Sequence, residues 1–161
     1  MAKKKHYWLM KSEPDAYSID DLERDGREPW NGIRNYQARN FLRDDMKEGD
    51  LAFFYHSNAK PPGIVGVMKI DSGPEPDRLA FDENSAYFDP KSDPEDPRWI
   101  QRQVRFVAKL PEMVTLEEMK RDENLEGMLV TRRGQRLSIQ PVDANHFRYL
   151  CKRGGLKTIP S

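Results

Sequence analysis

Aromatic, amide and arginine side chains are concentrated in the ten residues from Trp30 to Arg39, which read Trp-Asn-Gly-Ile-Arg-Asn-Tyr-Gln-Ala-Arg. The aromatic rings could stack on a planar base, and the arginines could hold its phosphates. Gly32 would let the backbone turn sharply within this run. The structural alternative is that the rings are core residues and the arginines form a solvated face, which is the more common fate of both residue types.

Two other short runs end in polar groups that could face the same ligand. Ser12 and Glu13 follow an apolar segment, and they could offer a hydroxyl and a carboxylate to the amino edge of a base. The alternative is a pair that only forms a turn. Tyr55, His56 and Ser57 close a second apolar segment and could line the mouth of a pocket. His56 by itself is more typical of a hydrogen-bonded structural histidine than of a catalytic base, because no nucleophile or acid lies at a diagnostic spacing.

Hydrophobic patterning predicts the strands and the helix that would carry these side chains. At about 100° per residue, the segment from residue 33 to about 47 places a narrow apolar stripe beside Tyr36, Arg39 and Arg43, as expected for a central helix. A turn at residues 29–32 would lead into it. Strands are expected at residues 6–11, 51–57, 64–70 and 99–110.

Other signals complete the predicted arrangement. Capping boxes at residues 18–21 and 115–118 predict two more helices. Pro141 suits the start of a last helix, whose apolar face would include Cys151 as a packing residue. Gly66, in the middle of a predicted strand, marks a bulge or a close approach of backbone.

Residues 71–97 differ in composition from the rest of the chain, with nine acidic residues, two basic residues and five prolines. A loop of this length in a compact domain is usually functional or mobile. Tyr87, in its one aromatic cluster, could cover a pocket, or could only anchor the loop. In the strand that follows, Arg102 and Arg105 could add positive charge near the groove, although solvent-facing arginines are common on strands.

The 161 residues suit one domain, residues 1–161, which is large enough to bury a core without disulfides or metal. The 27 basic residues balance the 27 acidic residues, so the chain carries no net charge. This balance disfavours non-specific tracking along nucleic acid, which depends on many phosphate contacts, but it allows a short local footprint. The basic turn at residues 132–136 could supply one such contact. The single cysteine excludes an intramolecular disulfide and a cysteine-rich zinc site.

The sequence contains few signals for export or catalysis. The apolar run after the basic residues 3–5 stops at Lys11, which is too short for a signal peptide or a membrane span, so we expect a cytoplasmic protein. No Walker loop, dinucleotide-binding glycine pattern, zinc-ligand spacing, nucleophile elbow or kinase signature occurs. We therefore expect no catalytic residue, no metal ligand and no cofactor.

Several runs match a known family in one continuous order. They include Tyr-Trp-Leu-Met-Lys-Ser-Glu-Pro at residues 7–14, the run at residues 30–40, Phe-Phe-Tyr-His-Ser at 53–57 and Arg-Leu-Ser-Ile-Gln-Pro-Val at 136–142. Shorter matches lie at residues 17–22, 49–50, 62–66 and 87–92. From residue 7 to about 153, the chain resembles the EVE-domain family of the PUA-like superfamily. Its departures are conservative, with isoleucine at positions 33 and 139 where valine is common.

The resemblance implies an α+β fold, a PUA-like mixed β-barrel with flanking helices. It relates the chain to the YTH readers of methylated RNA and implies no known catalysis. EVE-domain proteins are thought to bind modified bases, in DNA for some of them, by taking the nucleotide into a pocket with aromatic walls. Turning a base out of its stack costs a few kcal/mol, which stacking of about 1 to 3 kcal/mol and edge hydrogen bonds could offset.

We therefore expect a non-catalytic module that reads a modified base in DNA or RNA by accommodating the flipped nucleotide in such a pocket. Trp30, Tyr36 or Tyr55 would stack on the base, the hydroxyl, carboxylate and amide groups would read its edge, and the arginines, with Arg43, would hold the backbone. The predicted base-binding residues are Ser12, Glu13, Trp30, Arg34, Asn35, Tyr36, Arg39, Tyr55, His56 and Ser57. The expected partner is nucleic acid carrying a modified base, and the expected state is a monomer.

The alternative is an enzyme of nucleotide or RNA-modification metabolism that uses the same pocket with Glu13 or His56 as general base. No base-and-orienter pair at a diagnostic spacing favours it, and product formation from nucleosides or RNA would decide for it. A protein-interaction module would need a large exposed apolar patch, which no run in the sequence requires. The modification itself, and the choice between DNA and RNA, stay open at this point.

Overall fold

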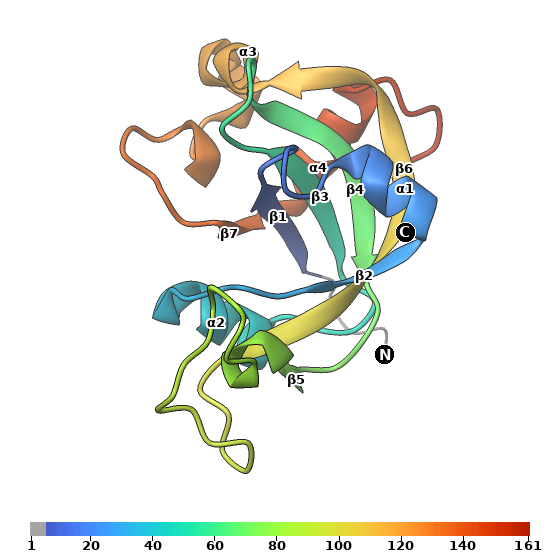
Figure 1. Cartoon of the computed structure of the whole chain (residues 1–161). Helices are drawn as coiled ribbons and strands as arrows, with labels where there is room; N and C mark the ends of the chain where they lie inside the picture. The colour runs from blue at the N-terminus through green and yellow to red at the C-terminus, as the bar shows by residue number, and fades with distance from the viewer. Residues whose placement is uncertain (1–5) are drawn as a thin grey trace, which may run out of the picture.

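Seven strands form one mixed sheet in the computed structural model, which describes residues 6–161 (Figure 1). The strands are β1 (Tyr7–Ser12), β2 (Arg27–Trp30), β3 (Leu51–His56), β4 (Gly63–Ile70), β5 (Glu75–Pro76), β6 (Ile100–Thr115) and β7 (Ile139–Val142). Their hydrogen-bonded order is β2-β6-β4-β3-β1-β7, and β5 pairs with β6. β1 and β3 run parallel, and the other pairs are antiparallel. The basic residues 3–5 lie outside the described part of the chain.

The described part contains four α-helices, α1 (Ile19–Asp25), α2 (Tyr36–Asn40), α3 (Leu116–Arg121) and α4 (Ala144–Arg153). Its shorter helical turns are η1 (Phe41–Asp45, π-helical) and the 3₁₀ turns η2 (Arg78–Phe81), η3 (Glu123–Leu125) and η4 (Leu129–Thr131). α1 begins with the predicted capping box, in which the Ser18 hydroxyl accepts from the Asp21 N–H and the Asp21 carboxylate accepts from the Ser18 N–H.

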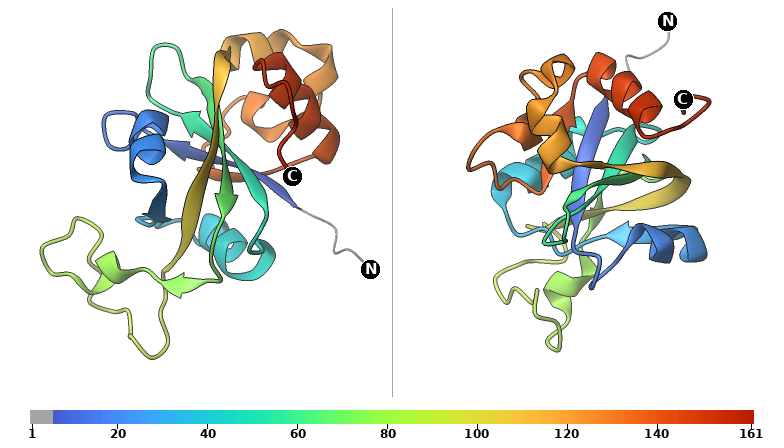
Figure 2. Two further views of the ribbon diagram at one scale, coloured as in Figure 1. Left: turned by 90° about the vertical axis from the view of Figure 1, so that its right-hand side faces the viewer. Right: turned by 90° about the horizontal axis from the view of Figure 1, so that it is seen from above.

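Alternation of side chains along β1 and β3 gives the sheet a packed core on each face. The first core includes Trp8 and Phe54 and is covered by α1, α2 and η1. The second core includes Leu9 and Phe53 and is covered by α3 and α4, with Phe147 of α4 stacked on Phe53 at 4.7 Å between ring centroids. Figure 2 shows α1 and α4 on opposite sides of the strands. The predicted α+β class with flanking helices is confirmed.

β6 passes through both cores because it is 16 residues long. Val104 belongs to the first core and Val114 to the second. The sequence predicts an end at residue 110, but pairing with the start of β4 continues the strand. Gly66 of β4 lies where the register shifts, and a Cβ there would come 2.4 Å from Ile19 Cδ1 of α1. The predicted bulge or close approach at Gly66 is confirmed.

Three elements differ from the sequence predictions. The central helix begins at Tyr36 rather than near residue 33, because Asn35 has extended backbone and caps it. Residues 27–30 form a strand, because they pair with β6, so the predicted turn is confined to the residues after Trp30. Pro141 lies in the edge strand β7, where its missing N–H is tolerated, and α4 starts only after residue 143.

Two features of the remaining chain agree with the sequence. Cys151 lies fully buried on the inner face of α4, as predicted for a packing residue, and burial raises the pKa of its thiol to about 12. The loop over residues 71–97 has little regular structure beyond β5 and η2. Within residues 6–161, no helix is both long enough and apolar enough to span a membrane.

Candidate functional site

A cavity of about 820 Å³ opens where the ends of several elements meet. Its walls come from the C-terminal end of β1, the end of β2 and the segment after it, the loop after β3, Tyr87, and residues just before β7. This volume lies in the range of pockets that hold small organic ligands. A smaller hollow of about 520 Å³ lies along α3 and the turn after it, and none of the predicted site residues lines it.

The parallel pairing of β1 and β3 explains why two of the predicted groups meet at this cavity. Parallel strands end at the same edge of a sheet, and Ser12 lies opposite His56 in the register. The Ser57 N–H donates to the Ser12 carbonyl at 3.0 Å, so the segments leaving the two strands stay together. Ser12, Glu13 and Ser57 all line the cavity.

Two of these polar groups already have one partner within the protein. The Ser12 hydroxyl donates to the Tyr17 carbonyl at 2.6 Å, and the Glu13 carboxylate accepts from the Asn58 amide. A hydroxyl that donates keeps its lone pairs, and a carboxylate has further acceptor sites. Both side chains can therefore still accept hydrogen bonds from a ligand.

Trp30 lies at the end of β2 and lines the cavity, although only 7% of its surface is exposed. Its ring meets Phe54 edge to face, with centroids 5.4 Å apart and an interplanar angle of 87°. The ring is therefore part of the first core and of the cavity wall at once. The core and ligand-binding interpretations of Trp30 do not exclude each other.

Asn35 and Arg43 make local contacts near the two ends of the central helical segment. Asn35 Oδ1 accepts from the Ala38 N–H at 3.0 Å and thereby caps α2. Arg43, on η1, pairs with its exposed neighbour Asp44 at 2.8 Å. Neither residue lines the cavity. The amide of Asn35 thus has a structural partner, while Arg43 lies on the open surface.

Tyr36 and Arg39 form an exposed stack outside the cavity. Tyr36 is 54% exposed, and its ring stacks on Trp99 with centroids 5.0 Å apart. The Arg39 guanidinium lies 4.9 Å from the Tyr36 centroid and donates to the Arg98 carbonyl at 2.8 Å. The two residues therefore offer an aromatic and a cationic group to the surface, not to the cavity.

Neither Tyr55 nor His56 lines the cavity. Tyr55 packs in the second core, and burial raises the pKa of its hydroxyl to about 12. His56 Nε2 accepts from the Ile19 N–H at the start of α1, at 3.1 Å. Burial lowers the pKa of His56, which favours the neutral ring that this hydrogen bond requires. His56 is thus a hydrogen-bonded structural histidine, the alternative that the sequence analysis considers more typical.

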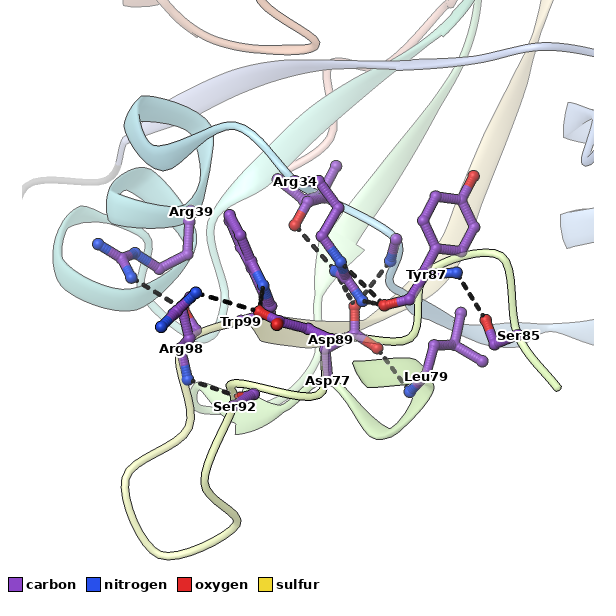
Figure 3. A network of polar contacts seen from close by, with 12 residues as sticks. Arg34, Arg39, Asp77, Leu79, Ser85, Tyr87, Asp89, Ser92, Arg98 and Trp99 are labelled. Carbon is purple, nitrogen blue, oxygen red and sulfur yellow. Dashed lines mark hydrogen bonds and ion pairs between the residues drawn. The ribbon is translucent and has the colours of Figure 1, made fainter. Parts of the chain in front are cut away.

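Arg34 is directed toward the loop over residues 71–97 (Figure 3). Its Nη1 donates to the Asp77 carboxylate at 2.9 Å, and its Nε and Nη2 donate to the Tyr87 carbonyl at 3.3 and 2.8 Å. A fourth hydrogen bond, also from Nη1, goes to the Ile33 carbonyl at 3.0 Å. These acceptors take up four of the five guanidinium N–H groups inside the protein.

Several residues that line the cavity are not singled out by the sequence. They are Lys11, Tyr17, Glu28, Asn31, Asn58, Gln135 and Ser138. Asn31 belongs to the run from Trp30 to Arg39, so a signal for it was present. Glu28 has no such signal, because β2 is not apparent in the sequence pattern. Arg136, in the predicted basic turn, also lines the cavity.

Two basic and two acidic side chains line the cavity, so these charges balance. The basic residues are Lys11 and Arg136, and the acidic residues are Glu13 and Glu28. Burial lowers the pKa of Lys11, whereas burial and the nearby Asp25 carboxylate raise the pKa of Glu28. Such a wall offers donors and acceptors to a polar, neutral ligand. Among residues 6–161, no three His, Cys, Asp or Glu side chains are grouped so that they could hold a metal ion.

Arg102 and Arg105 do not bring positive charge to the cavity, contrary to the sequence expectation. Arg102 is only 2% exposed. Its guanidinium donates to the carbonyls of Leu42, Met46 and Ser72, at 2.7, 2.6 and 2.9 Å. Arg105 forms an exposed ion pair elsewhere. Because Arg102 satisfies carbonyls at the end of a helical segment, it is a structural residue.

Comparisons with known proteins support the resemblance that the sequence runs suggest. The sequence model of the EVE domain matches residues 6–153. Thymocyte nuclear protein 1 of Mus musculus is 42% identical in an alignment 164 residues long, and the alignment covers 90% of this chain and 72% of the relative. The crystal structure of human THYN1 in complex with DNA containing 5-methylcytosine is 39% identical, with a TM-score of 0.87, and the match covers 96% of this chain and 100% of that one.

A YTH domain shares the fold at much lower sequence identity. The YTH domain of Zygosaccharomyces rouxii MRB1, solved in complex with N6-methyladenosine RNA, gives a TM-score of 0.53 at 14% identity. The match covers 99% of this chain and 92% of that one. At this identity the likeness concerns the fold alone, and it confirms the expected structural relation to YTH domains.

Proposed function

The chain belongs to the EVE-domain family, and on this premise we propose that it is a non-catalytic reader of a modified base in nucleic acid. The base, turned out of its strand, would lie in the cavity of about 820 Å³. Since a human relative was crystallised with DNA containing 5-methylcytosine, a modified cytosine in DNA is the first ligand to test.

The observation that carries this proposal is the combination of groups on the cavity wall. Trp30 supplies aromatic surface, while Glu13 and the two serines, Ser12 and Ser57, supply polar groups at the edge where β1 and β3 end. A carboxylate accepts from an exocyclic amine, which cytosine and adenine carry and thymine lacks. The Glu13 carboxylate is exposed in the free protein, so a bound base without that amine would cover the carboxylate without pairing it, at a cost of about 1 to 3 kcal/mol. The wall would therefore discriminate between bases as well as bind them.

Contacts to the nucleic-acid backbone are few in this proposal. Arg136 and Lys11 line the cavity and would hold the phosphates next to the everted base, and Arg39, on the neighbouring surface, could add a third contact. Two or three phosphate contacts give a slope of log K against log salt concentration of only about −2 to −3. The balanced charge of the whole chain agrees with this limited footprint.

The non-catalytic part of the proposal is supported by the partners of the two candidate bases. His56 uses Nε2 to accept from a backbone N–H, and the Glu13 carboxylate is engaged by the Asn58 amide. Within residues 6–161, neither is hydrogen-bonded to a second titratable group that would orient it for proton transfer. We also propose that the protein is a monomer and that it is located in the cytoplasm.

The test is a panel of short DNA and RNA oligonucleotides, single-stranded and double-stranded, with unmodified, methylated or hydroxymethylated bases. We expect fluorescence anisotropy to show about tenfold tighter binding, or about 1.4 kcal/mol, for one modified base over its unmodified form. Two salt concentrations would show the shallow slope. Equal binding to every oligonucleotide, or a new product found by mass spectrometry after incubation with nucleosides or RNA, would overturn the proposal.

A matched pair of variants locates the ligand in the cavity. Glu13→Gln replaces one acceptor oxygen by an amide donor and should remove most of the preference for an amine-bearing base. Glu117→Gln makes the same change on α3, beside the smaller hollow, and should leave binding unchanged. If both variants bind like the unmodified protein, the base does not lie against Glu13.

A further inference from the structure

Tyr87 is the residue that the loop over residues 71–97 contributes to the cavity wall. Its side chain remains 45% exposed while it packs against Gly32 in the segment after β2. A Cβ at Gly32 would lie 3.1 Å from two atoms of the Tyr87 ring, and Gly32 has a φ of +77°. Both the spacing and the backbone conformation therefore favour glycine opposite this ring.

Arg34 fixes the main chain of Tyr87 against the same segment (Figure 3). Its Nε and Nη2 both donate to the Tyr87 carbonyl, the latter at 2.8 Å. The guanidinium also lies over two rings, 5.3 Å from the centroid of Tyr87 and 5.2 Å from that of Trp99. The planar fork of arginine can donate twice to one carbonyl while its face lies over a ring, a geometry that the compact ammonium of lysine does not reproduce.

Asp77 in turn holds Arg34 in place. Its carboxylate is fully buried and accepts from Arg34 Nη1 at 2.9 Å, from the Gly32 N–H at 2.8 Å and from the Leu79 N–H at 2.9 Å. One side chain of the loop is thereby bonded to the segment that lines the cavity. A buried carboxylate needs such partners, and two of the three, Arg34 and Gly32, belong to that segment.

A second anchor lies on the other side of Tyr87 in the sequence. The Asp89 carboxylate accepts from Trp99 Nε1 at 2.8 Å, and the Asp89 N–H donates to the Ala80 carbonyl at 2.9 Å. Trp99 is largely buried at the point where the loop rejoins β6. Tyr87 is thus held between two anchored points, and its position does not depend on its own ring contacts alone.

From these contacts we infer that Tyr87 is a base-contacting wall of the cavity, and that Arg34 and Asp77 are the residues that position it. The inference rests on the proposed function and adds the aromatic surface on which the everted base would stack. Every base has a flat face, so Tyr87 would set affinity, whereas the polar edge near Glu13 would set selectivity. Arg34 is then a positioning residue and not a phosphate contact.

The role of Tyr87 is tested with the oligonucleotide that the unmodified protein prefers. Tyr87→Ala should weaken binding about tenfold or more, because stacking on the ring is lost. Tyr87→Phe keeps the ring and should bind within about twofold of the unmodified protein. Phe88→Ala removes the next aromatic residue, which is exposed and does not line the cavity, and should leave binding unchanged. Binding by Tyr87→Ala that equals the unmodified protein would overturn the inference.

The role of Arg34 is tested by salt dependence. If Arg34 is a positioning residue, Arg34→Gln should weaken binding about as much as Tyr87→Ala does. The slope of log K against log salt should then stay unchanged. A phosphate contact would instead lose about one unit of slope, as expected for the matched variant Arg136→Gln. Arg34→Lys keeps a charge beside Asp77 for the fold but lacks the fork, so it should bind as weakly as Arg34→Gln. Full affinity in Arg34→Lys, or a reduced slope in Arg34→Gln, would contradict the positioning role.

The two levels of proposal fail in different ways. If the unmodified protein shows no selective binding to any oligonucleotide, the proposed function is wrong. If it binds selectively, and the Tyr87→Ala and Arg34→Gln variants bind with the same affinity as the protein without substitutions, only the further inference is wrong. The double variant Arg34→Lys with Tyr87→Ala should be no weaker than Tyr87→Ala alone, because residues acting through one another are not additive.

Discussion

At the scale of single residues, the arginines of this chain have different roles although their side chains are the same. Arg102 is buried and satisfies three backbone carbonyls, whereas Arg34 joins a loop to the cavity wall. Arg136 lines the cavity itself. The number of protein acceptors within reach of each guanidinium distinguishes these roles, since every N–H group that is used inside the protein is one donor fewer for a ligand.

Asn35 offers a residue-scale prediction, because one amide could either cap α2 or read a base. Asn35→Ala should lower the free energy of unfolding by about 1 kcal/mol, since the Ala38 N–H loses its acceptor. Asn35→Asp should keep the stability of the unmodified protein, because a carboxylate also caps and favours the helix N-terminus. Urea denaturation followed by circular dichroism measures both values.

The same two variants show whether Asn35 touches the ligand. If Asn35 only caps α2, Asn35→Asp should bind the preferred oligonucleotide with the same affinity as the protein without substitutions. A tenfold loss of affinity by Asn35→Asp that persists at high salt, where the added negative charge is screened, would instead mean that the amide donates to the base.

At the scale of elements, the parallel pairing of β1 and β3 has the largest effect on the site. It brings Ser12 and Ser57 to one edge of the sheet, although 44 residues separate them in the sequence. α1 is then fixed over the first core by His56, which accepts from the first N–H of the helix. The polar end of β3 therefore serves both the cavity and the attachment of a helix.

The attachment of α1 predicts a pH dependence. Burial lowers the pKa of His56, and of the nearby charges Asp20 raises it while Lys109 lowers it. Because the folded pKa lies below the unfolded value of about 6.5, the unfolded chain binds the proton more tightly. The free energy of unfolding therefore falls as the pH drops below about 6.5. In His56→Gln an amide oxygen can still accept from Ile19, but it does not titrate.

Urea unfolding between pH 8 and pH 5 (about one point per half unit) measures this effect. The stability of the unmodified protein relative to His56→Gln should be constant above about pH 7 and should decline below it. Parallel curves over the whole range would show that the hydrogen bond between His56 and α1 does not depend on a neutral ring.

At the scale of the whole molecule, the two cores are coupled by strands that they share. Successive residues of β1 and β3 point into opposite cores, and β6 contributes side chains to both, so the two cores share three strands. The chain is therefore expected to unfold as one cooperative unit.

Phe147→Ala tests this coupling. The ring is fully buried in the second core, where it stacks on Phe53 and Tyr7, and its loss should cost about 3 to 5 kcal/mol. Of the three tryptophans, Trp8 and Trp30 lie in the first core, and Trp99 stacks on Tyr36 of α2, which covers that core. Tryptophan fluorescence therefore reports on the face opposite Phe147. The fluorescence and circular-dichroism midpoints in urea should shift together. Circular dichroism that shifts while fluorescence does not would mean that the two faces unfold separately.

Local patterns in the sequence are sufficient to predict much of the fold. Alternation and apolar runs locate the central strands, the capping box at Ser18 locates α1, and Gly66 marks the close approach to that helix. Such features depend on neighbouring residues and on a fixed period, so they can be recognised before folding is known. The order of matched runs also identifies the EVE-domain family. The sequence further singles out Ser12, Glu13, Trp30 and Ser57, all of which line the cavity.

The remaining features of the site depend on contacts between distant segments, which no local pattern encodes. Alternation along β3 directs Tyr55 into the second core and away from the cavity. Two acceptors of Arg34, Asp77 and the Tyr87 carbonyl, lie more than 40 residues away in the sequence, on the same loop. Glu28 reaches the cavity only because β2 pairs with β6. The sequence by itself thus determined the family, the fold class and the residue types available. The tertiary structure decided which of them face the cavity, because side-chain direction and hydrogen-bond partners are set only when the strands pair and the loop is anchored.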